Sequence, residues 1–266
     1  MTDTRRILED LAEGKTTVDQ AMQRLRLLSL DTVEGLAVLD TDRLTRSGVP
    51  EVVMAETKSP AEVAKIAAKM LETSGFALIT RLVNEKLNHL KGEIHGHRML
   101  EFGRDPHLTA LIHREDWRPP ETGAKIGIIT AGTSDIPYAE EARAIAHVMG
   151  VEALSFYDVG VAGIHRLIEP LRKIVENDVD AIVVFAGMEG ALPTVVAALV
   201  DIPVIGVPVP VGYGFGGGGK AALASMLQSC APGLAVVNIG NGFGGAAMAA
   251  LIAVRATKKR GVPSSH

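Results

Sequence analysis

The chain has 266 residues, of which 47% are hydrophobic and 22% charged, and its net charge at neutral pH is −4. This composition is typical of one large or two smaller packed domains, and an acidic balance offers no extended surface for nucleic acid. The single cysteine, Cys230, excludes an intrachain disulfide and any multi-cysteine metal cluster. Because the charged start lacks a signal-peptide core and no apolar run reaches about 18 residues, we expect a cytoplasmic protein with neither a membrane nor a nucleic-acid partner.

The first part of the chain predicts short helices followed by a small α/β unit. Residues 1–30 predict two helices, and the second opens with a capping box formed by Thr17 and Gln20. Residues 31–115 predict a smaller α/β domain, with strands at 52–55 and 75–82 and helices that begin after Ser59 and at 84–91. The segment 93–113 has no clear periodicity.

A regular alternation of strands and helices follows a polar, proline-rich stretch at 114–123, which we interpret as a domain linker. Strands are expected at 125–130, 153–158, 181–185, 204–209 and 234–239, and helices at 138–149, 164–177, 192–200, 221–229 and 245–256. This alternation is typical of βαβ units, so residues 120–256 predict a doubly wound parallel sheet with helices on both faces. Residues 257–266 are expected to form a disordered tail.

Polar and glycine-rich loops follow the predicted strands at one edge of this sheet. Ligands of such sheets bind beyond the carboxyl ends of the strands, so we expect the functional site there. The loops are 131–135, 157–160, 186–190, 210–220 and 238–245. They contain the candidate site residues Ser134, Asp135, Asp158, Gly187, Glu189, Lys220 and Asn241, and His165 lies shortly after the second loop.

Several candidates also have an ordinary structural explanation. Ser134 and Asp135 are favoured helix N-caps, and a carboxylate such as Glu189 is stabilised near a helix N-terminus. His165 opens a helix, where a solvated position explains it equally well. The segment 214–220 has the spacing of a phosphate-binding loop, but Ala221 stands where that motif needs a hydroxyl. A general anion-binding role for Lys220 remains open.

Cys230 stands between two glycine-rich segments, where a thiol could attack a nucleotide-like substrate. Free cysteines are also common as small buried hydrophobes, so position alone leaves both interpretations open. His95 and His97 suggest a metal site, but no carboxylate pattern nearby completes one, and solvated or structural histidines fit the sequence better.

Two motifs carry a family resemblance. Ala131-Gly-Thr-Ser-Asp135 looks like the first phosphate loop of the aminoimidazole ribonucleotide carboxylase/mutase superfamily of purine synthesis. Ala186-Gly-Met-Glu-Gly-Ala-Leu-Pro193, followed by 202–208, resembles the central block of the same superfamily. The purine enzymes carry a catalytic histidine two residues before that proline, and this sequence has Ala191 there.

Most of the chain is similar to a sister family, the pyridinium-3,5-biscarboxylic acid mononucleotide synthases of nickel-pincer cofactor synthesis. This similarity lies in Glu189, in Cys230, and in the segments 40–58, 157–166, 212–214 and 238–245. It implies an enzyme that converts nicotinic acid adenine dinucleotide, CO2 and water into the biscarboxylated mononucleotide and AMP.

The resemblance also implies roles for the candidate residues. Cys230 becomes the nucleophile that adds to ring C4, and Glu189 becomes the base that removes the C5 proton. The remaining assignments are substrate or ribose orientation for Asp135 and Asp158, phosphate contacts for Ser134, Lys220 and Asn241, and substrate binding for His165 and Gly187.

Magnesium is the expected ion, held mostly by substrate phosphates with Asp135 or Asp158 as a single carboxylate ligand. We also expect a homo-oligomer, for which the octamers of the superfamily are the precedent. Two alternatives remain: a carboxylase or mutase of a purine precursor, against which Ala191 counts, and a non-catalytic nucleotide-binding module in which Cys230 is simply buried.

Overall fold

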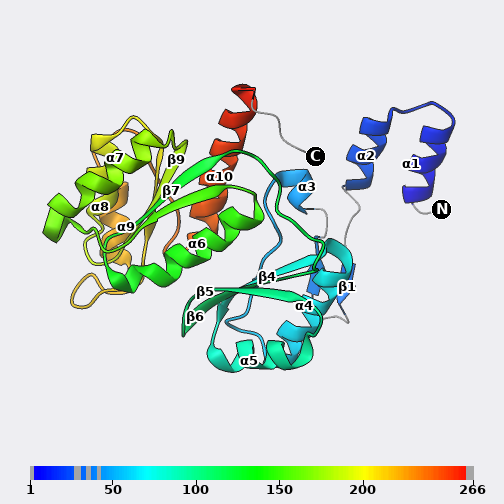
Figure 1. Cartoon of the computed structure of the whole chain (residues 1–266), viewed down its shortest axis with the longest axis horizontal. Helices are drawn as coiled ribbons and strands as arrows, with labels where there is room; N and C mark the ends of the chain where they lie inside the picture. Colours follow the sequence, from blue (N-terminus) through cyan, green and yellow to red (C-terminus); the bar gives the residue numbers. More distant parts are fainter. Residues whose placement is uncertain (1–2, 27–30, 34–36, 41–42, 262–266) are drawn as a thin grey trace.

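The computed structural model describes residues 3–26, 31–33, 37–40 and 43–261. A mixed sheet near the N-terminal end and a larger parallel sheet near the C-terminal end lie side by side with helices between them (Figure 1). The order of layers is α4 and α5, the mixed sheet, α6 and α10, the parallel sheet, and then α7, α8 and α9. Both sheets are therefore covered on each face, as an α/β fold requires.

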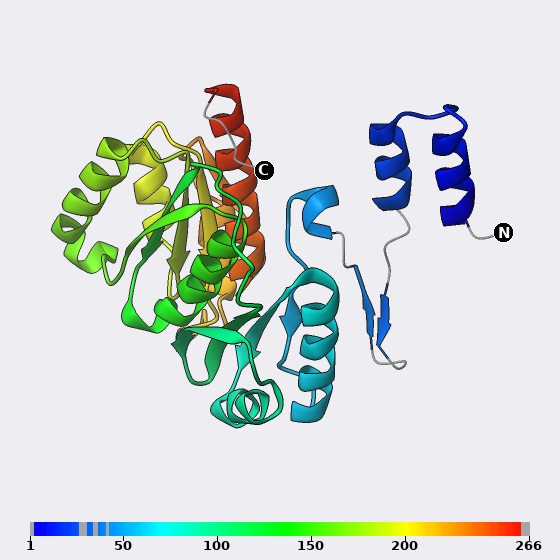
Figure 2. The same cartoon turned by 45° about the vertical axis from the view of Figure 1, so that its right-hand side comes forward.

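The chain begins with a helical hairpin of α1 (Asp3–Ala12) and α2 (Val18–Arg26), which stands apart from both sheets in Figures 1 and 2. The predicted capping box is confirmed, because the Thr17 N–H donates to Gln20 Oε1 at 3.1 Å and the Gln20 N–H donates to Thr17 Oγ1 at 3.2 Å. A short antiparallel pair, β1 (Asp31–Val33) and β2 (Ala37–Leu39), and the helix α3 (Arg43–Ser47) follow.

The mixed sheet has the strand order β3-β4-β6-β5. Its elements are β3 (Val53–Met54), α4 (Pro60–Ser74), β4 (Phe76–Leu82), α5 (Asn84–Glu93), β5 (Arg98–Arg104) and β6 (His107–His113). The predicted start of α4 is confirmed: Ser59 accepts from the Glu62 N–H at 3.3 Å, and Glu62 accepts from the Ser59 N–H at 2.7 Å.

The segment 93–113, which the sequence left without a pattern, contains the hairpin β5–β6. The reason lies in the burial of the two strands. β5 is an edge strand and is mostly exposed, so it carries charged residues, whereas β6 is almost entirely buried, including the polar side chains of Thr109 and His113. Neither strand is therefore half-buried, the condition under which alternation identifies a strand from sequence.

The parallel sheet has the order β11-β10-β9-β7-β8. Its strands are β7 (Lys125–Thr130), β8 (Glu152–Phe156), β9 (Ala181–Ala186), β10 (Val204–Pro208) and β11 (Leu234–Val236). Its helices are α6 (Ile136–Val148), α7 (Ile168–Glu176), α8 (Leu192–Leu199), α9 (Lys220–Leu227) and α10 (Gly242–Lys259), with short 3₁₀ turns η1 (Thr133–Asp135) and η2 (Val161–Leu167). The predicted doubly wound parallel sheet is confirmed, and α10 extends to Lys259, into the stretch expected to be a tail.

Alternation along the strands divides the core between the two faces of this sheet. Ile126 and Ile128 point toward α6 and α10, whereas Ile129 points toward the opposite layer of helices. The first of these clusters also contains Leu78 and Phe102 of the mixed sheet. The two sheets thus pack against the same helix, α6, and share one hydrophobic core.

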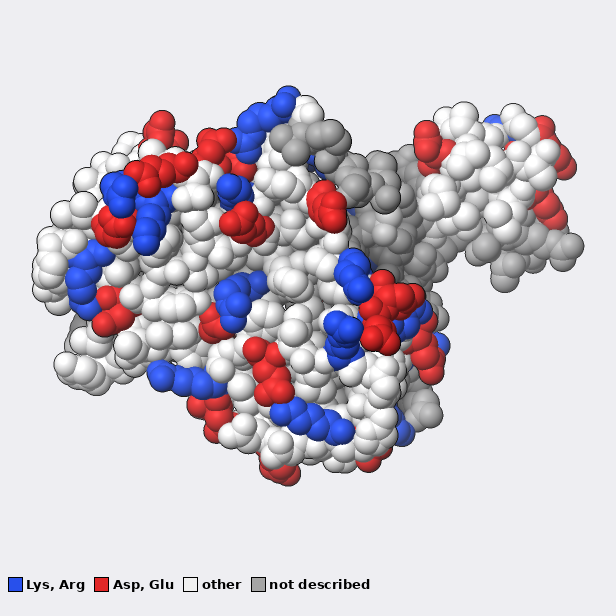
Figure 3. Space-filling view, in the orientation of Figure 1, with Lys and Arg blue, Asp and Glu red and all other residues white. Residues whose placement is uncertain are grey.

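The residues between the sheets, 114–123, are irregular, and Trp117 among them packs on Phe76 with ring centroids 5.2 Å apart. On the face shown in Figure 3, basic and acidic side chains are interspersed, so neither sign forms an extended field there. Within the described residues, no helix has the length and apolar character needed to cross a membrane.

Candidate active site

A cavity of about 680 Å³ opens at the carboxyl ends of β7, β8, β9 and β10. In the order of this sheet, β7 and β9 are neighbours although β8 lies between them in sequence, which makes their ends the topological switch point. Ligands of open α/β sheets bind at such a point, and the volume falls within the range of about 300–1,000 Å³ usual for small-molecule sites. Four of the five predicted loops reach this cavity.

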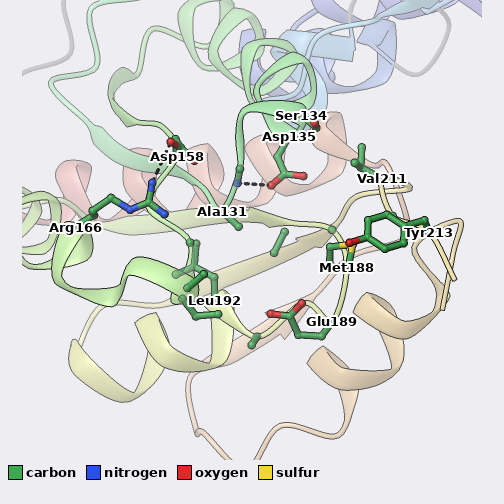
Figure 4. A pocket seen from close by; sticks show the side chains of 18 residues that line it. Ala131, Ser134, Asp135, Asp158, Arg166, Met188, Glu189, Leu192, Val211 and Tyr213 are labelled. Carbon is green, nitrogen blue, oxygen red and sulfur yellow. Dashed lines mark hydrogen bonds and ion pairs between the residues drawn. The ribbon is translucent and has the colours of Figure 1, made fainter. Parts of the chain in front are cut away.

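The loop after β7 places Ser134 and Asp135 at the cavity. Asp135 is almost fully buried, and its Oδ2 accepts a hydrogen bond from the Gly132 N–H at 2.8 Å (Figure 4). Burial raises the pKa of this carboxyl from its ordinary 3.8 to about 6, although hydrogen bonds from the Gly132 and Gly187 N–H groups favour the ionised form. Asp135 therefore ties the loops after β7 and β9 together at one side of the site.

The loop after β8 contributes an ion pair. Asp158 has the left-handed φ of 58°, and its Oδ2 accepts from Arg166 Nη1 at 3.0 Å. Both side chains line the cavity, and Figure 4 shows the pair on the same side as Asp135. Arg166 presents a guanidinium group to the cavity, which is suited to a phosphate or carboxylate.

Glu189 lies on the opposite side of the cavity, in the tight turn between β9 and α8 (Figure 4). The residue before it, Met188, is held at φ 53°, which is uncommon for a non-glycine residue. Its N–H donates to Val211 O at 3.0 Å, and a Cβ built on Gly187 would lie only 2.3 Å from the same oxygen. The turn thus needs glycine at position 187, and it fixes an exposed carboxylate at the cavity rim.

The remaining predicted residues do not line this cavity. His165 is an exposed residue of η2, and Lys220 is the exposed first residue of α9. Asn241 caps α10, where its Oδ1 accepts from the Gly244 N–H at 2.8 Å, and it lines a smaller cavity of about 150 Å³ between the two sheets.

Cys230 lies outside the cavity as well. It is an exposed residue of the connection from α9 to β11. Its neighbour Ser229 accepts a hydrogen bond from Thr194, in the first turn of α8, at 2.9 Å. The thiol is thus close to the helix that begins after Glu189, but within one chain it does not face the same space.

Two residues of the site were not assigned a role from the sequence. Arg166 follows the predicted residue His165 directly in the sequence. It could have been found from the segment 157–166, which contains Asp158, the acidic residue that pairs with it. Tyr213 is 83% exposed at the rim of the cavity. It belongs to the predicted glycine-rich loop, but the sequence predicted no role for its aromatic ring.

No group of three or more His, Cys, Asp or Glu side chains suited to a metal ion occurs among the residues that the structure describes. His95 and His97 line a separate cavity of about 350 Å³ on the mixed sheet's side of the molecule, together with Glu72 and Glu93. His97 Nδ1 lies 2.8 Å from the backbone oxygen of His95, which gives that ring a structural contact.

Comparison with known proteins identifies both parts of the chain. Residues 31–107 match the LarB/PurE-like N-terminal domain family, and residues 125–261 match the AIR carboxylase family. An uncharacterized protein of Methanocaldococcus jannaschii is 43% identical over 238 residues, which are 88% of this chain and 91% of that protein.

A second group of similar proteins shares only part of the chain. The N5-carboxyaminoimidazole ribonucleotide mutase of Pyrococcus abyssi is 36% identical over 119 residues, 43% of this chain and 64% of the mutase. Among solved structures, a novel cobalamin-binding protein from Desulfitobacterium hafniense aligns over 97% of this chain and 90% of its own, with 14% identity and a TM-score of 0.35, a likeness too weak to bear on fold or function.

Proposed function

The chain belongs to the family that joins a LarB/PurE-like N-terminal domain to an AIR carboxylase domain, and from this membership we propose a specific reaction. The enzyme carboxylates C5 of the pyridinium ring of nicotinic acid adenine dinucleotide with CO2 and hydrolyses the phosphoanhydride. The products are pyridinium-3,5-biscarboxylic acid mononucleotide and AMP. Its resemblance to the biscarboxylic acid mononucleotide synthases supports the choice of this substrate.

One observation carries the proposal: Glu189 faces a switch-point cavity whose other side holds Asp158 and Arg166. A carboxylate across from a guanidinium group suits a substrate that offers phosphate at one end and a proton to be removed at the other. Ala191 also lines this cavity, in the position where the purine enzymes carry their catalytic histidine. The site therefore lacks the imidazole of a purine mutase and supplies a carboxylate instead.

The chemistry explains why a thiol and a carboxylate are needed. A pyridinium ring is too electron-poor to attack CO2, but addition of the Cys230 thiolate to C4 yields an enamine that is nucleophilic at C5. C5 then bonds to the carbon of CO2. Glu189 removes the C5 proton, and the electron pair of that C–H bond restores the aromatic ring while the C4–S bond breaks and releases the thiolate.

The exposed position of Cys230 supports a homo-oligomer in which this face is covered. Large apolar side chains are exposed at the cavity rim, in the glycine-rich loop and at the end of α9: Met188, Tyr213, Phe215 and Leu227 are 44%, 83%, 112% and 64% exposed. Exposed apolar side chains at a cavity rim, such as those of Met188 and Tyr213, are common at association sites. A neighbouring chain that packs on this face would place its own Cys230 thiol at the cavity of its partner.

Mixed oligomers test whether two chains share one site. Cys230→Ser and Glu189→Gln chains, each inactive alone, should regain part of the activity when combined if the thiol and the carboxylate come from different chains. No recovery in a mixed oligomer that has formed would mean that Cys230 reaches the cavity of its own chain.

Magnesium fits this site as an ion carried mainly by the substrate. Asp135 is buried and accepts hydrogen bonds from backbone N–H groups, so Asp158, exposed and paired with Arg166, is the residue better suited to offer one oxygen ligand. When bound, the ion would offset the negative charge of the two phosphates. Arg166 and the N–H groups of the surrounding loops would orient the same phosphates.

Product analysis tests the proposed reaction directly. The protein is incubated with nicotinic acid adenine dinucleotide, ¹³C-bicarbonate and magnesium, and the products are separated and weighed by mass spectrometry. We expect one labelled carboxyl group in the mononucleotide and an equal amount of AMP. Unchanged dinucleotide would contradict the proposal, and turnover of N5-carboxyaminoimidazole ribonucleotide instead would establish the purine alternative.

A further inference from the structure

A second cavity, of about 580 Å³, lies directly beside the candidate active site and is used by none of the roles described so far. Two loops form the wall between the cavities. Asp135 lines the first cavity and Ile136 the second, and in the same way Asp158 lines the first and Tyr157 the second. Because consecutive residues face the two spaces, the wall is a single loop thick.

Two arginines line the second cavity, Arg104 and Arg143, and they differ in whether a carboxylate pairs with them. Glu140 is buried there, and it accepts from Arg143 Nε at 2.9 Å and from the Tyr157 hydroxyl. This pairing neutralises Arg143 and holds the pKa of Glu140 below its ordinary value even though burial opposes it. Arg104 has no such partner: in the part of the chain that the structure describes it makes no ion pair, and its Nη2 donates only to the backbone oxygen of Thr133, at 3.0 Å.

The position of Arg104 links the two cavities. It is the last residue of β5, at the turn that leads into β6, and Thr133 is the residue before Ser134 at the rim of the active-site cavity. An exposed, uncompensated guanidinium group at this point is placed to bind an anion that lies across the rim.

The lining of the second cavity also includes planar and hydrogen-bonding side chains. Arg143 stacks its guanidinium over the Phe102 ring, with Cζ 4.8 Å from the centroid, and the Tyr157 ring lies nearby as part of the same network. Planar groups of this kind stack well on nucleobases. Ser155 also lines this cavity and belongs to β8, an edge strand with no neighbour on its outer side among the described strands.

We propose that the second cavity binds the nucleoside monophosphate half of a dinucleotide substrate whose reacting half occupies the active-site cavity. The phosphate bridge crosses the rim beside Ser134 and Arg104, and the base lies against Tyr157 and Arg143. This proposal rests on the proposed function for the identity of the dinucleotide. In this arrangement β5 of the mixed sheet contributes one residue, Arg104, to a site built mainly by the parallel sheet.

The test measures AMP binding to the substrate-free protein by calorimetry. Arg104→Ala should weaken AMP binding by about tenfold or more, the loss expected for one charge-assisted contact to phosphate, and it should leave adenosine binding unchanged. Arg98→Ala is the matched control, because Arg98 lies on the same strand and pairs with Glu115 away from the cavity. In turnover, Arg104→Ala should raise the KM for the dinucleotide more than it lowers kcat.

Photolabelling of the wild-type protein with 8-azido-AMP provides a measurement that needs no variant. Labelled peptides from 143–157 would support the proposal, and labels confined to 187–213, or AMP affinity that Arg104→Ala leaves unchanged, would overturn it. The outcomes separate this proposal from the proposed function. AMP binding at the second cavity without carboxylation would reject only the reaction, whereas normal carboxylation by Arg104→Ala would reject only the cavity.

Discussion

Two neighbouring glutamates of α6 should respond to mutation in opposite directions. Glu141 is 5% exposed and, among the residues that the structure describes, accepts only from the Phe243 N–H, at 3.1 Å, so burial raises its pKa from the ordinary 4.5 to about 7. Glu140 is also buried, but hydrogen bonds from Arg143 and Tyr157 lower its pKa. Replacing each by glutamine preserves the shape of the side chain and removes only its charge.

The expected effect of Glu141→Gln follows from linkage between protonation and folding. The folded protein holds the Glu141 proton up to about pH 7, whereas the unfolded chain releases it near 4.5, so the wild type loses stability as the pH rises through this window. A pKa difference of this size lowers the free energy of unfolding by about 3 kcal/mol at pH 8. Glu141→Gln should escape that loss, while below pH 4.5 the two proteins should differ little.

The measurement is the unfolding free energy from urea titrations at pH 4.5, 6 and 8, with thermal midpoints as a second observable. At pH 8, Glu141→Gln should raise the thermal midpoint by about 6 °C, and Glu140→Gln should lower the stability by about 1–3 kcal/mol because it leaves Arg143 unpaired. The reasoning would be refuted if Glu141→Gln gave the same stability difference at all three pH values, or if the two variants behaved alike.

Three further predictions concern the candidate site. Glu189→Gln removes the base but keeps the shape, so thiol adduct should accumulate without turnover; a wild-type rate would rule out the assigned role. Gly187→Ala should destabilise the protein by about 1–3 kcal/mol and abolish activity, because its Cβ would lie 2.3 Å from Val211 O. Its control, Gly92→Ala in α5, meets no atom within 4 Å and should leave activity intact. Chelation should stop phosphoanhydride cleavage, and magnesium should restore it, with only weak magnesium binding in dialysis without substrate; tight binding of a transition metal would contradict this and redirect attention to His95 and His97.

Local signals in the sequence were sufficient for most of the fold. The capping boxes at Thr17 and Ser59 lie where predicted because each depends on residues three positions apart. The three central strands of the parallel sheet, β7, β9 and β10, are short apolar runs buried on both faces, which makes them easy to recognise. The hairpin β5–β6 escaped recognition because its two strands differ in exposure, and that difference arises from the edge position of β5 in the folded sheet.

Fewer of the site residues could be predicted from the sequence, because residues that are close along the chain are not always close in space. Cys230 lies between two glycine-rich loops in sequence, but α9 carries the chain away from the cavity before the cysteine is reached. Asn241 follows the last strand, as a loop residue of the site should, but it caps α10 and faces the interface between the two sheets. Asp135 and Glu189 come together because they follow strands that belong to the same switch point.

The covalent bond between Cys230 and the pyridinium ring is the most direct test of the proposed mechanism. The protein is mixed with nicotinic acid adenine dinucleotide in the absence of CO2, quenched rapidly, and weighed intact by mass spectrometry before peptide mapping. We predict a mass increase equal to one substrate molecule, located on the peptide that contains Cys230 and absent from Cys230→Ser, which should also form no product. Product formation by Cys230→Ser at the wild-type rate would contradict the account.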